Sequence, residues 1–392
     1  MKKLILSLSI LALTFTGCST TDDEDTTQTP VVGELTGSIT SNRTIAFGNY
    51  TLKGIVTIES GVTVTFDAGS TITANAADGV DALVVKNGGK LIMNGTAAQP
   101  IILTEPSATP GAWGGIIMYG DAPITGAPVN GVAVASKNSE DGLNLSYGGT
   151  NAAHNGGTLR YVRVEYAGKK ITDGTSEMNG FSFYSVGSGT ILENLVSYKG
   201  ADDGYEFYGG TVSAKNLISY GNFDDSFDWQ DGWKGENNTN WYAYQVTTGN
   251  FGMEIEASNN NNAYYPVISN ITLKRAAGTV TEGGSSAAEY DAIQFKKHGN
   301  GHFSNIVISG YITTGATAVR IQDANANTQV NEGKIKLTSV KINDNTTSKF
   351  ATVGTTITVN FLDANYTLSS SATGAGLTAG AWSKVNGVDL IQ

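Results

Sequence analysis

The sequence predicts an all-β fold, a parallel β-helix in which short coils stack on one another. One segment is used twice, because Leu195–Phe207 returns 22 residues later as Leu217–Trp229. Apolar and polar residues alternate within each copy, which indicates strands with one buried face. Short strands separated by Gly or Asn corners at such a period are typical of a parallel β-helix, since one coil buries its apolar face only against a copy of itself.

The alternating pattern recurs and predicts a column of six stacked rungs. Its members are Phe181–Phe183, Tyr205–Phe207, Phe227–Trp229, Met253–Ile255, Ile293–Phe295 and Val319–Ile321. A second column of short apolar strands runs beside it from Val162 to Ile342. We expect the apolar residues of the first column to fill the coil and their polar partners to face outward.

The chain begins like an exported protein. Lys2 and Lys3 precede an apolar run that is too short to span a bilayer, and small residues lead to Cys18. This predicts a signal peptide over residues 1–17. The segment resembles the lipobox of bacterial lipoproteins, which implies that Cys18 is lipidated and anchors the chain to a membrane. A stray or buried thiol is the alternative for this single cysteine.

Residues 18–34 are predicted to be an acidic, disordered tether, because they lack apolar periodicity. The acidic run 22–25 resembles the export signal of surface lipoproteins in Bacteroidota, although a solvated charge run is an equal alternative. We therefore expect a lipid-anchored outer-membrane protein that faces the cell exterior.

The rest of the chain is predicted to form one solenoid. Residues 35–334 contain the coils, with regularly spaced glycines between the first strands. A long decorating loop is expected at 121–157, which is rich in Gly, Asn, Ser and Ala. Residues 335–392 are expected to form the last coils and a C-terminal cap that closes the open end.

Composition excludes one class of partner. The chain has 49 Gly, only 24 Lys or Arg, and a net charge of −11. No nucleic-acid partner is expected for such an acidic surface.

Four segments carry a family resemblance. They are Gly111–Ile116, Leu159–Gly168, Gly200–Gly210 and Tyr220–Asp228. Together they resemble a family of outer-membrane lipoproteins of Bacteroidota, which implies a right-handed, single-stranded parallel β-helix, a pectate-lyase-like solenoid. The family has no established activity, so the resemblance implies a fold and a location but no reaction.

Carboxylates are expected to gather on one outer face. Glu206, Asp228 and Glu254 share one position in successive rungs, and Asp203 and Asp225 form a second pair nearby. Carboxylates at a rung spacing of about 5 Å repel one another unless a cation or proton lies between them. Oxygen ligands without His or Cys suit Ca²⁺, so these five residues are the predicted metal ligands.

Two other interpretations of the same five residues remain open. Asp at a coil corner also caps backbone N–H groups, which is a purely structural role. Paired carboxylates also match a glycoside hydrolase or a polysaccharide lyase, in which these five residues would be catalytic. A lyase needs a base, and Arg320 is the only basic residue at the position of the first column that Glu206, Asp228 and Glu254 occupy.

Aromatic and amide side chains give two further predictions. Trp233, Trp241 and Tyr242 lie in what is predicted to be a decorated loop, where they are candidates for stacking on sugar rings, with loop packing as the alternative. The amides of Asn194, Asn216, Asn270 and Asn305 precede the second column and are expected to bond along the rod.

The sequence thus favours a cell-surface lipoprotein that acts as a non-catalytic binding or interaction module for a glycan or an envelope protein, with bound calcium as a possible cofactor. A polysaccharide lyase or glycoside hydrolase is the rival interpretation, and a structural spacer is the third.

Overall fold

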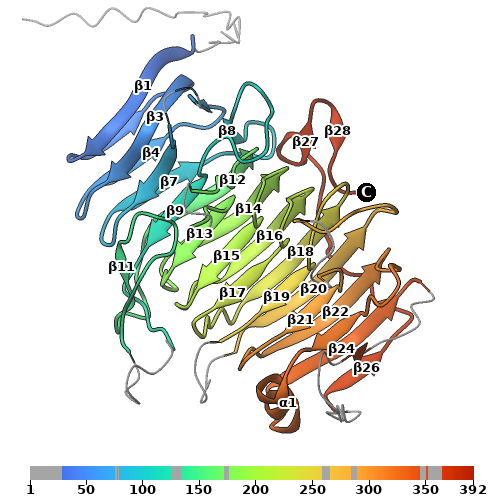
Figure 1. Ribbon diagram of the computed structural model, residues 1–392. Coiled ribbons are helices and arrows are strands. Elements are labelled where there is room, and N and C mark those ends of the chain that lie inside the picture. Colours follow the sequence, from blue (N-terminus) through green and yellow to red (C-terminus); the bar gives the residue numbers. More distant parts are fainter. Residues whose placement is uncertain are drawn as a thin grey trace, which may run out of the picture.

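The computed structural model describes residues 29–75, 77, 79–125, 134–171, 176–257, 265–283, 289–344, 350–351 and 364–392. Successive coils pair through parallel strands from one end of the molecule to the other (Figure 1). The predicted all-β, pectate-lyase-like parallel β-helix is therefore confirmed. The predicted signal peptide 1–17, Cys18 and the tether up to residue 28 lie outside the described residues.

The first coils are built from short strands. They are β1 (Val31–Ile39), β2 (Arg43–Ile45), β3 (Gly48–Ile58), β4 (Thr63–Phe66), β5 (Thr71–Ala74), β6 (Ala82–Val85), β7 (Lys90–Asn94), β8 (Ile101–Thr104) and β9 (Ile116–Tyr119). β1 already pairs with β3, with Val31 opposite Gly48. The solenoid therefore begins at Val31 and not at residue 35, because the end of the predicted tether belongs to the first rung.

Two columns form the remaining coils. The first contains β13 (Phe181–Tyr184), β15 (Tyr205–Tyr208), β17 (Asp228–Gln230), β19 (Met253–Ile255), β21 (Ile293–Phe295), β23 (Val319–Ile321) and β25 (Phe350–Ala351). The second contains β12 (Gly157–Glu165), β14 (Ile191–Tyr198), β16 (Ala214–Tyr220), β18 (Asn238–Gln245), β20 (Val267–Arg275), β22 (Gly301–Ser309), β24 (Ile335–Ile342) and β26 (Tyr366–Leu368). The two predicted columns are confirmed, but the sequence did not predict three of their strands, which are β18, β25 and β26.

Aromatic side chains of adjacent rungs stack inside the coils. The rings of Phe181 and Tyr205 lie 5.0 Å apart and nearly parallel, and Tyr205 continues to Phe227 at 5.5 Å. All three side chains are fully buried. The stack shows why alternation with large apolar residues specifies this fold, since each ring is covered by the ring of the next coil.

An asparagine ladder runs along one corner of the second column. Asn194, Asn216, Asn240, Asn270 and Asn305 all have positive φ, a conformation that Asn tolerates better than other non-glycine residues. From Asn216 onward, each side-chain amide donates to the side-chain oxygen of the preceding Asn, at distances from 2.7 to 3.4 Å. The predicted ladder is confirmed, and Asn240 is an additional member.

The excursion at 121–157 contains an antiparallel hairpin of β10 (Lys137–Asn138) and β11 (Ser146–Tyr147). Tyr147 packs against Tyr184 and Tyr208 of the first column, with ring centroids 5.0 and 6.2 Å apart. The excursion is therefore docked on the rod and covers one end of β13 and β15.

The C-terminal segment differs from the predicted cap. After β26 the chain runs back along the outside of the middle coils, through η2 (Ala381–Ser383), β27 (Lys384–Val385) and β28 (Val388–Asp389) (Figure 1). Trp382, Val385 and Leu390 pack on Val196 and Ile218. These two residues point outward and supply an apolar surface, which explains why the segment covers the side of the rod.

Helix α1 (Ala324–Asn331) lies instead beside the last coils, where Ala326 and Val330 join the core (Figure 1). The sequence did not predict this helix. Among the described residues, the structure has no helix that is long and apolar enough to cross a membrane.

Candidate functional site

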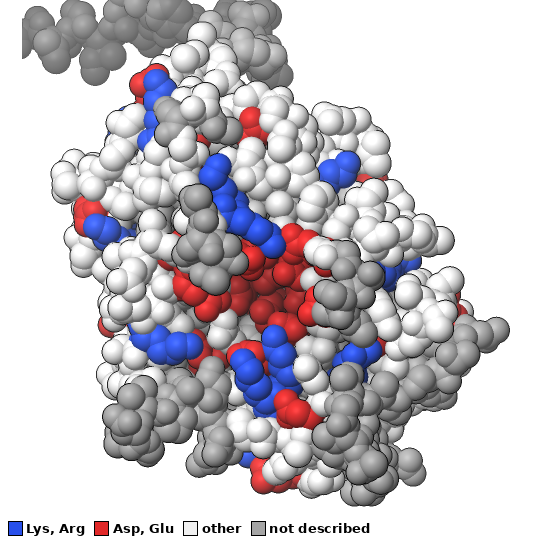
Figure 2. Space-filling view, viewed as in Figure 1, with Lys and Arg blue, Asp and Glu red and all other residues white. Residues whose placement is uncertain are grey.

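An acidic cavity of about 370 Å³ opens on the outer face of the first column. Figure 2 shows it as a recess filled with Asp and Glu side chains. The carboxylates that line it are Glu140, Glu177, Asp202, Asp203, Glu206, Asp224, Asp225, Asp228, Glu254, Glu256 and Glu289. All five predicted site carboxylates are among them.

The floor of the cavity is the predicted carboxylate column. Glu206 of β15 pairs with Asp228 of β17, which in turn pairs with Glu254 of β19. Glu206 and Asp228 line the cavity and are only 5 % and 9 % exposed. The predicted stacking is confirmed, but two of these outward-facing carboxylates, Glu206 and Asp228, are buried in the cavity.

The Asp corners have the structural role that the sequence allowed. One carboxylate oxygen of Asp203 accepts the backbone N–H of Asp225 in the next coil at 2.8 Å. Asp225 accepts the N–H of Phe251 in the same way at 2.6 Å. Asp291, two coils beyond Asp225, accepts the N–H of Thr317 at 2.5 Å. Corner bonding therefore explains why Asp is used repeatedly at this position.

These corners differ in whether the Asp carboxylate has a positively charged partner. Asp291 forms an ion pair with Arg320 at 2.5 Å, and both side chains are buried. Among the described residues, Asp203 and Asp225 have no such pair with Lys or Arg, although both are also buried. The corner role thus accounts for one oxygen of each carboxylate but leaves the negative charge in the cavity uncompensated.

Burial and mutual repulsion disfavour ionisation of these groups. Burial, followed by the charge of Glu140, raises the pKa of Glu206 to about 8. Burial, followed by the charge of Glu282, raises the pKa of Asp224 to about 7. Burial and the charge of Glu206 likewise raise the pKa of Asp228 well above its ordinary value. Without a bound cation, several of these groups hold protons near neutral pH.

The hydrogen bonding of Glu206 and Asp228 differs. Glu206 is held by neutral donors, since it accepts from Asn179 Nδ2 at 2.7 Å, from Gln230 Nε2 at 3.1 Å and from the hydroxyl of Tyr208. By contrast, Oδ1 of Asp228 is buried and has no hydrogen-bond partner among the described residues. A buried acceptor without a partner is costly, so this oxygen is suited to a ligand.

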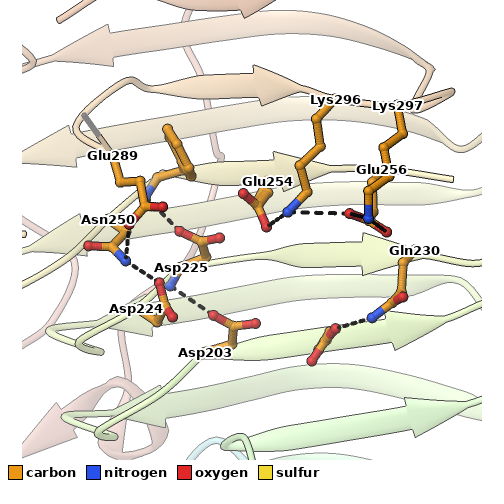
Figure 3. Close-up of polar contacts among 12 residues, drawn as sticks. Asp203, Asp224, Asp225, Gln230, Asn250, Glu254, Glu256, Glu289, Lys296 and Lys297 are labelled. Carbon is orange, nitrogen blue, oxygen red and sulfur yellow. Dashed lines mark hydrogen bonds and ion pairs between the residues drawn. The ribbon is translucent and has the colours of Figure 1, made fainter. Parts of the chain in front are cut away.

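Two lysines reach the cavity and were missed by the sequence analysis (Figure 3). Lys296 forms ion pairs with Glu254 and, at 3.3 Å, with Glu256, while Lys297 pairs with Glu256 at 2.7 Å. Burial lowers the pKa of Lys296, but the charges of Glu254 and Asp228 outweigh this and raise it. Lys296 is therefore protonated and acts as a counter-charge.

The excursion adds one wall of the cavity. Gln230 Nε2 donates to Glu140 Oε1 at 3.2 Å as well as to Glu206. Lys137 and Tyr147 of the same excursion hold Asp231 at 2.8 and 2.6 Å. No sequence signal connects Glu140 with strands that lie about ninety residues later, because tertiary packing alone brings them together.

The prediction that three aromatic side chains stack on sugar rings is wrong. Trp233, Trp241 and Tyr242 are 1 %, 0 % and 3 % exposed. Trp241 pairs with Leu217 and Ile271, so it occupies the inward position of a coil that the sequence analysis had treated as a loop. Tyr242 lies under the C-terminal segment, with its hydroxyl 3.2 Å from the carbonyl oxygen of Gln392. Neither indole nor phenol is available to a sugar ring.

The donor set suits a hard divalent cation. Asp203, Glu206 and Asp228 offer oxygen atoms within 4.8 Å of one another, and so do Asp225, Asp228 and Glu254. Ca²⁺ takes six to eight oxygen ligands and tolerates irregular geometry, as such carboxylate groups require. None of the three histidines lines the cavity in the part of the chain that the structure describes. The arrangement thus fits Ca²⁺ better than zinc.

The chain was compared with curated sequences, solved structures and family profiles. No curated protein sequence matches the chain. One similar solved structure is described as "Crystal structure of Dettilon tailspike protein (gp208)", with 12 % identity and a TM-score of 0.18 over 80 % of this chain and 62 % of that chain. A family profile described as "Pectate-lyase like beta helix domain" matches residues 37–386. The chain belongs to this family of pectate-lyase-like β-helix domains.

Proposed function

We propose that this chain is a lipid-anchored cell-surface module that binds Ca²⁺ in the acidic cavity and uses it to hold an acidic glycan. One observation carries the proposal. Asp225 and Asp291 have the same corner role, yet only Asp291 has a buried guanidinium partner. The cavity therefore carries an excess of negative charge, and a bound cation neutralises it.

The cation centre consists of the five predicted residues. Asp228 lies at its middle, since it belongs both to the group with Asp203 and Glu206 and to the group with Asp225 and Glu254. Its Oδ1 has no hydrogen-bond partner among the described residues and is free to coordinate. A divalent ion at this point offsets the repulsion between neighbouring rungs and lowers the pKa of each ligand.

The charge balance at the cavity mouth favours an acidic glycan as the ligand. Without cations the carboxylates far outnumber Lys296 and Lys297, and the cavity repels an anion. A bound Ca²⁺ keeps open coordination positions that a uronate carboxylate takes. Lys297, whose side chain is 57 % exposed, lies at the rim and is placed to form a second ion pair with such a ligand.

Location is the part of the proposal that rests on the sequence. The signal-like residues 1–17 and Cys18 support lipidation, and the acidic run 22–25 supports display on the outer surface. Labelling with a radioactive fatty acid tests the anchor, and loss of the label in Cys18→Ala is the expected result. Protease accessibility on intact cells tests the orientation.

Calorimetry of the chelator-stripped full chain tests the cation. We expect saturable Ca²⁺ binding in which Asp228→Asn loses the ion held at Asp228, whereas Glu193→Gln, a control at a partly exposed ion pair outside the cavity, keeps all binding. A glycan array with and without EDTA then tests the ligand. Binding to uronate-rich glycans that EDTA abolishes supports the proposal, whereas binding that ignores EDTA contradicts it.

A second candidate is a polysaccharide lyase, which the two lysines of the cavity favour. Elimination from a uronate needs a base and a cation that stabilises the carboxylate of the substrate. The raised pKa of Lys296 opposes that role unless the substrate displaces its carboxylate partners. Release of unsaturated or reducing chain ends that is lost in Asp225→Asn and Lys296→Met would establish catalysis and overturn the non-catalytic proposal.

A further inference from the structure

A second group of carboxylates lies at the other end of the cavity from Lys296. Glu177, Asp202 and Asp224 offer oxygen atoms that all lie within 4.8 Å of one another. Asp202 and Asp224 are the first residues of the two Asp-Asp pairs, whose second residues, Asp203 and Asp225, belong to the predicted centre. Only the second member of each pair was predicted to be a metal ligand.

Each end of the cavity has three carboxylates that the other end does not need, although Asp224 also groups with Asp203 and Asp225. The group of Glu177, Asp202 and Asp224 shares no residue with the group of Asp225, Asp228 and Glu254. Two cations can therefore be held at the same time, each by its own three side chains. Asp203 lies between them, since it groups with Asp228 on one side and with Asp224 on the other.

Each end also contains one buried acceptor without a hydrogen-bond partner. Asp202 is 2 % exposed, and its Oδ2 has no partner among the described residues. Asp228 Oδ1 is the equivalent atom of the first centre. Because an unpartnered buried carboxylate oxygen is costly, two such atoms in two separate groups indicate two ligands and not one.

The side chains nearby hold the second group in place but do not neutralise it. Lys170 pairs with Glu177 at 3.1 Å and with Glu282 at 2.9 Å. Asn250 donates to Asp224, and also to Glu289 at 3.2 Å. One lysine thus faces five carboxylates, which are Glu177, Asp202, Asp224, Glu282 and Glu289.

We propose that the cavity holds two divalent cations, and that Glu177, Asp202 and Asp224 form the second centre. The second centre rests on the proposed cation-binding role of the cavity, but it needs no glycan. It also explains why both residues of each Asp-Asp pair are acidic, since the second residue of each pair serves the coil corner and the first centre while the first residue serves the second centre.

The test is the stoichiometry of Ca²⁺ binding to the full chain after chelation, measured by calorimetry at pH 8.5 and by native mass spectrometry. We expect two ions per chain. Asp202→Asn and Asp228→Asn should each bind one ion, and the double variant should bind none. Glu193→Gln should still bind two. Circular dichroism of each variant verifies the fold, and Asn has nearly the same size and shape as Asp.

The possible outcomes separate the two proposals. One ion per chain that is lost in Asp228→Asn but retained in Asp202→Asn overturns the second centre and leaves the proposed function standing. No binding to the unmodified chain overturns both. Two ions that both persist in Asp202→Asn place the second ion elsewhere and also overturn the assignment.

Discussion

Asp225 and Asp291 occupy the same corner position in two coils of the solenoid, and each accepts a backbone N–H from the next coil. Asp291 is paired with the buried guanidinium of Arg320, whereas Asp225 faces the acidic cavity. The same local structure therefore carries a neutralised charge in one coil and an uncompensated charge in another. This contrast separates the structural need for Asp from its role in binding.

Substitution of the two aspartates should have opposite effects on stability. Asp291→Asn leaves the buried Arg320 without its counter-charge and should lower the free energy of unfolding by about 3–5 kcal/mol. Asp225→Asn keeps an acceptor for Phe251 and removes a repelled charge, so at pH 8 and without cations it should raise that free energy by about 1–2 kcal/mol. Urea unfolding in EDTA measures both. Equal destabilisation by the two variants would contradict the uncompensated charge of Asp225.

The stability of the cation-free protein should fall as pH rises. The pKa of Glu206 is raised from 4.5 to about 8, so the folded state keeps a proton that the unfolded state releases. The contribution of Glu206 to the free energy of unfolding then decreases as the pH rises from about 4.5 to about 8. Saturating Ca²⁺ removes the decrease, because the ion stabilises the ionised carboxylates. Urea titrations at several pH values test this, and identical pH profiles with and without Ca²⁺ would argue against a cation in the cavity.

Trp241 should matter for stability but not for recognition. Its side chain is fully buried, and its indole N–H donates to the carbonyl of Ala214 at 3.1 Å. Trp241→Ala should cost about 3–5 kcal/mol in the free energy of unfolding. Trp241→Phe should cost less and leave glycan affinity unchanged. If the folded Phe variant loses glycan binding, Trp241 contacts the ligand after all.

The C-terminal segment should stabilise the middle coils. Arg163 donates to the carbonyls of Ala381 and Lys384 at 3.2 and 2.7 Å, and Trp382 packs on Tyr161. Removing residues 381–392 uncovers Val196 and Ile218 and should lower the melting temperature markedly. Tyr242→Phe, which loses only the contact with Gln392, should cost about 0.5–1.5 kcal/mol. A truncated chain that melts like the full chain would show that the segment is only loosely attached.

The fold could be predicted because alternation and period report directly on coil stacking. Phe181, Tyr205 and Phe227 stack as expected, and the outward column of Glu206, Asp228 and Glu254 follows from the same alternation. Where the pattern was interrupted, prediction failed. The coil that contains Trp241 was treated as a loop, and its core tryptophan was therefore assigned to the surface.

The rest of the cavity depends on contacts that no local pattern records. Glu140 arrives from the docked excursion, and Lys296 follows the last residue of β21, where alternation ends at the corner. The course of the C-terminal segment was also unpredictable, because the outward direction of Val196 and Ile218 depends on the register of β14 and β16. The sequence predicted which residues lie in the strands, but it did not predict which segments pack on the side of the coils.

Crystals of the full chain grown with CaCl₂ provide the most direct test of cation binding, through an anomalous difference map. We expect a peak beside Asp228 Oδ1, with oxygen ligands at about 2.3–2.6 Å from Asp228 and its neighbours in the cavity. A map without such a peak, in which the ammonium group of Lys296 has moved to Asp228 Oδ1, would contradict the account.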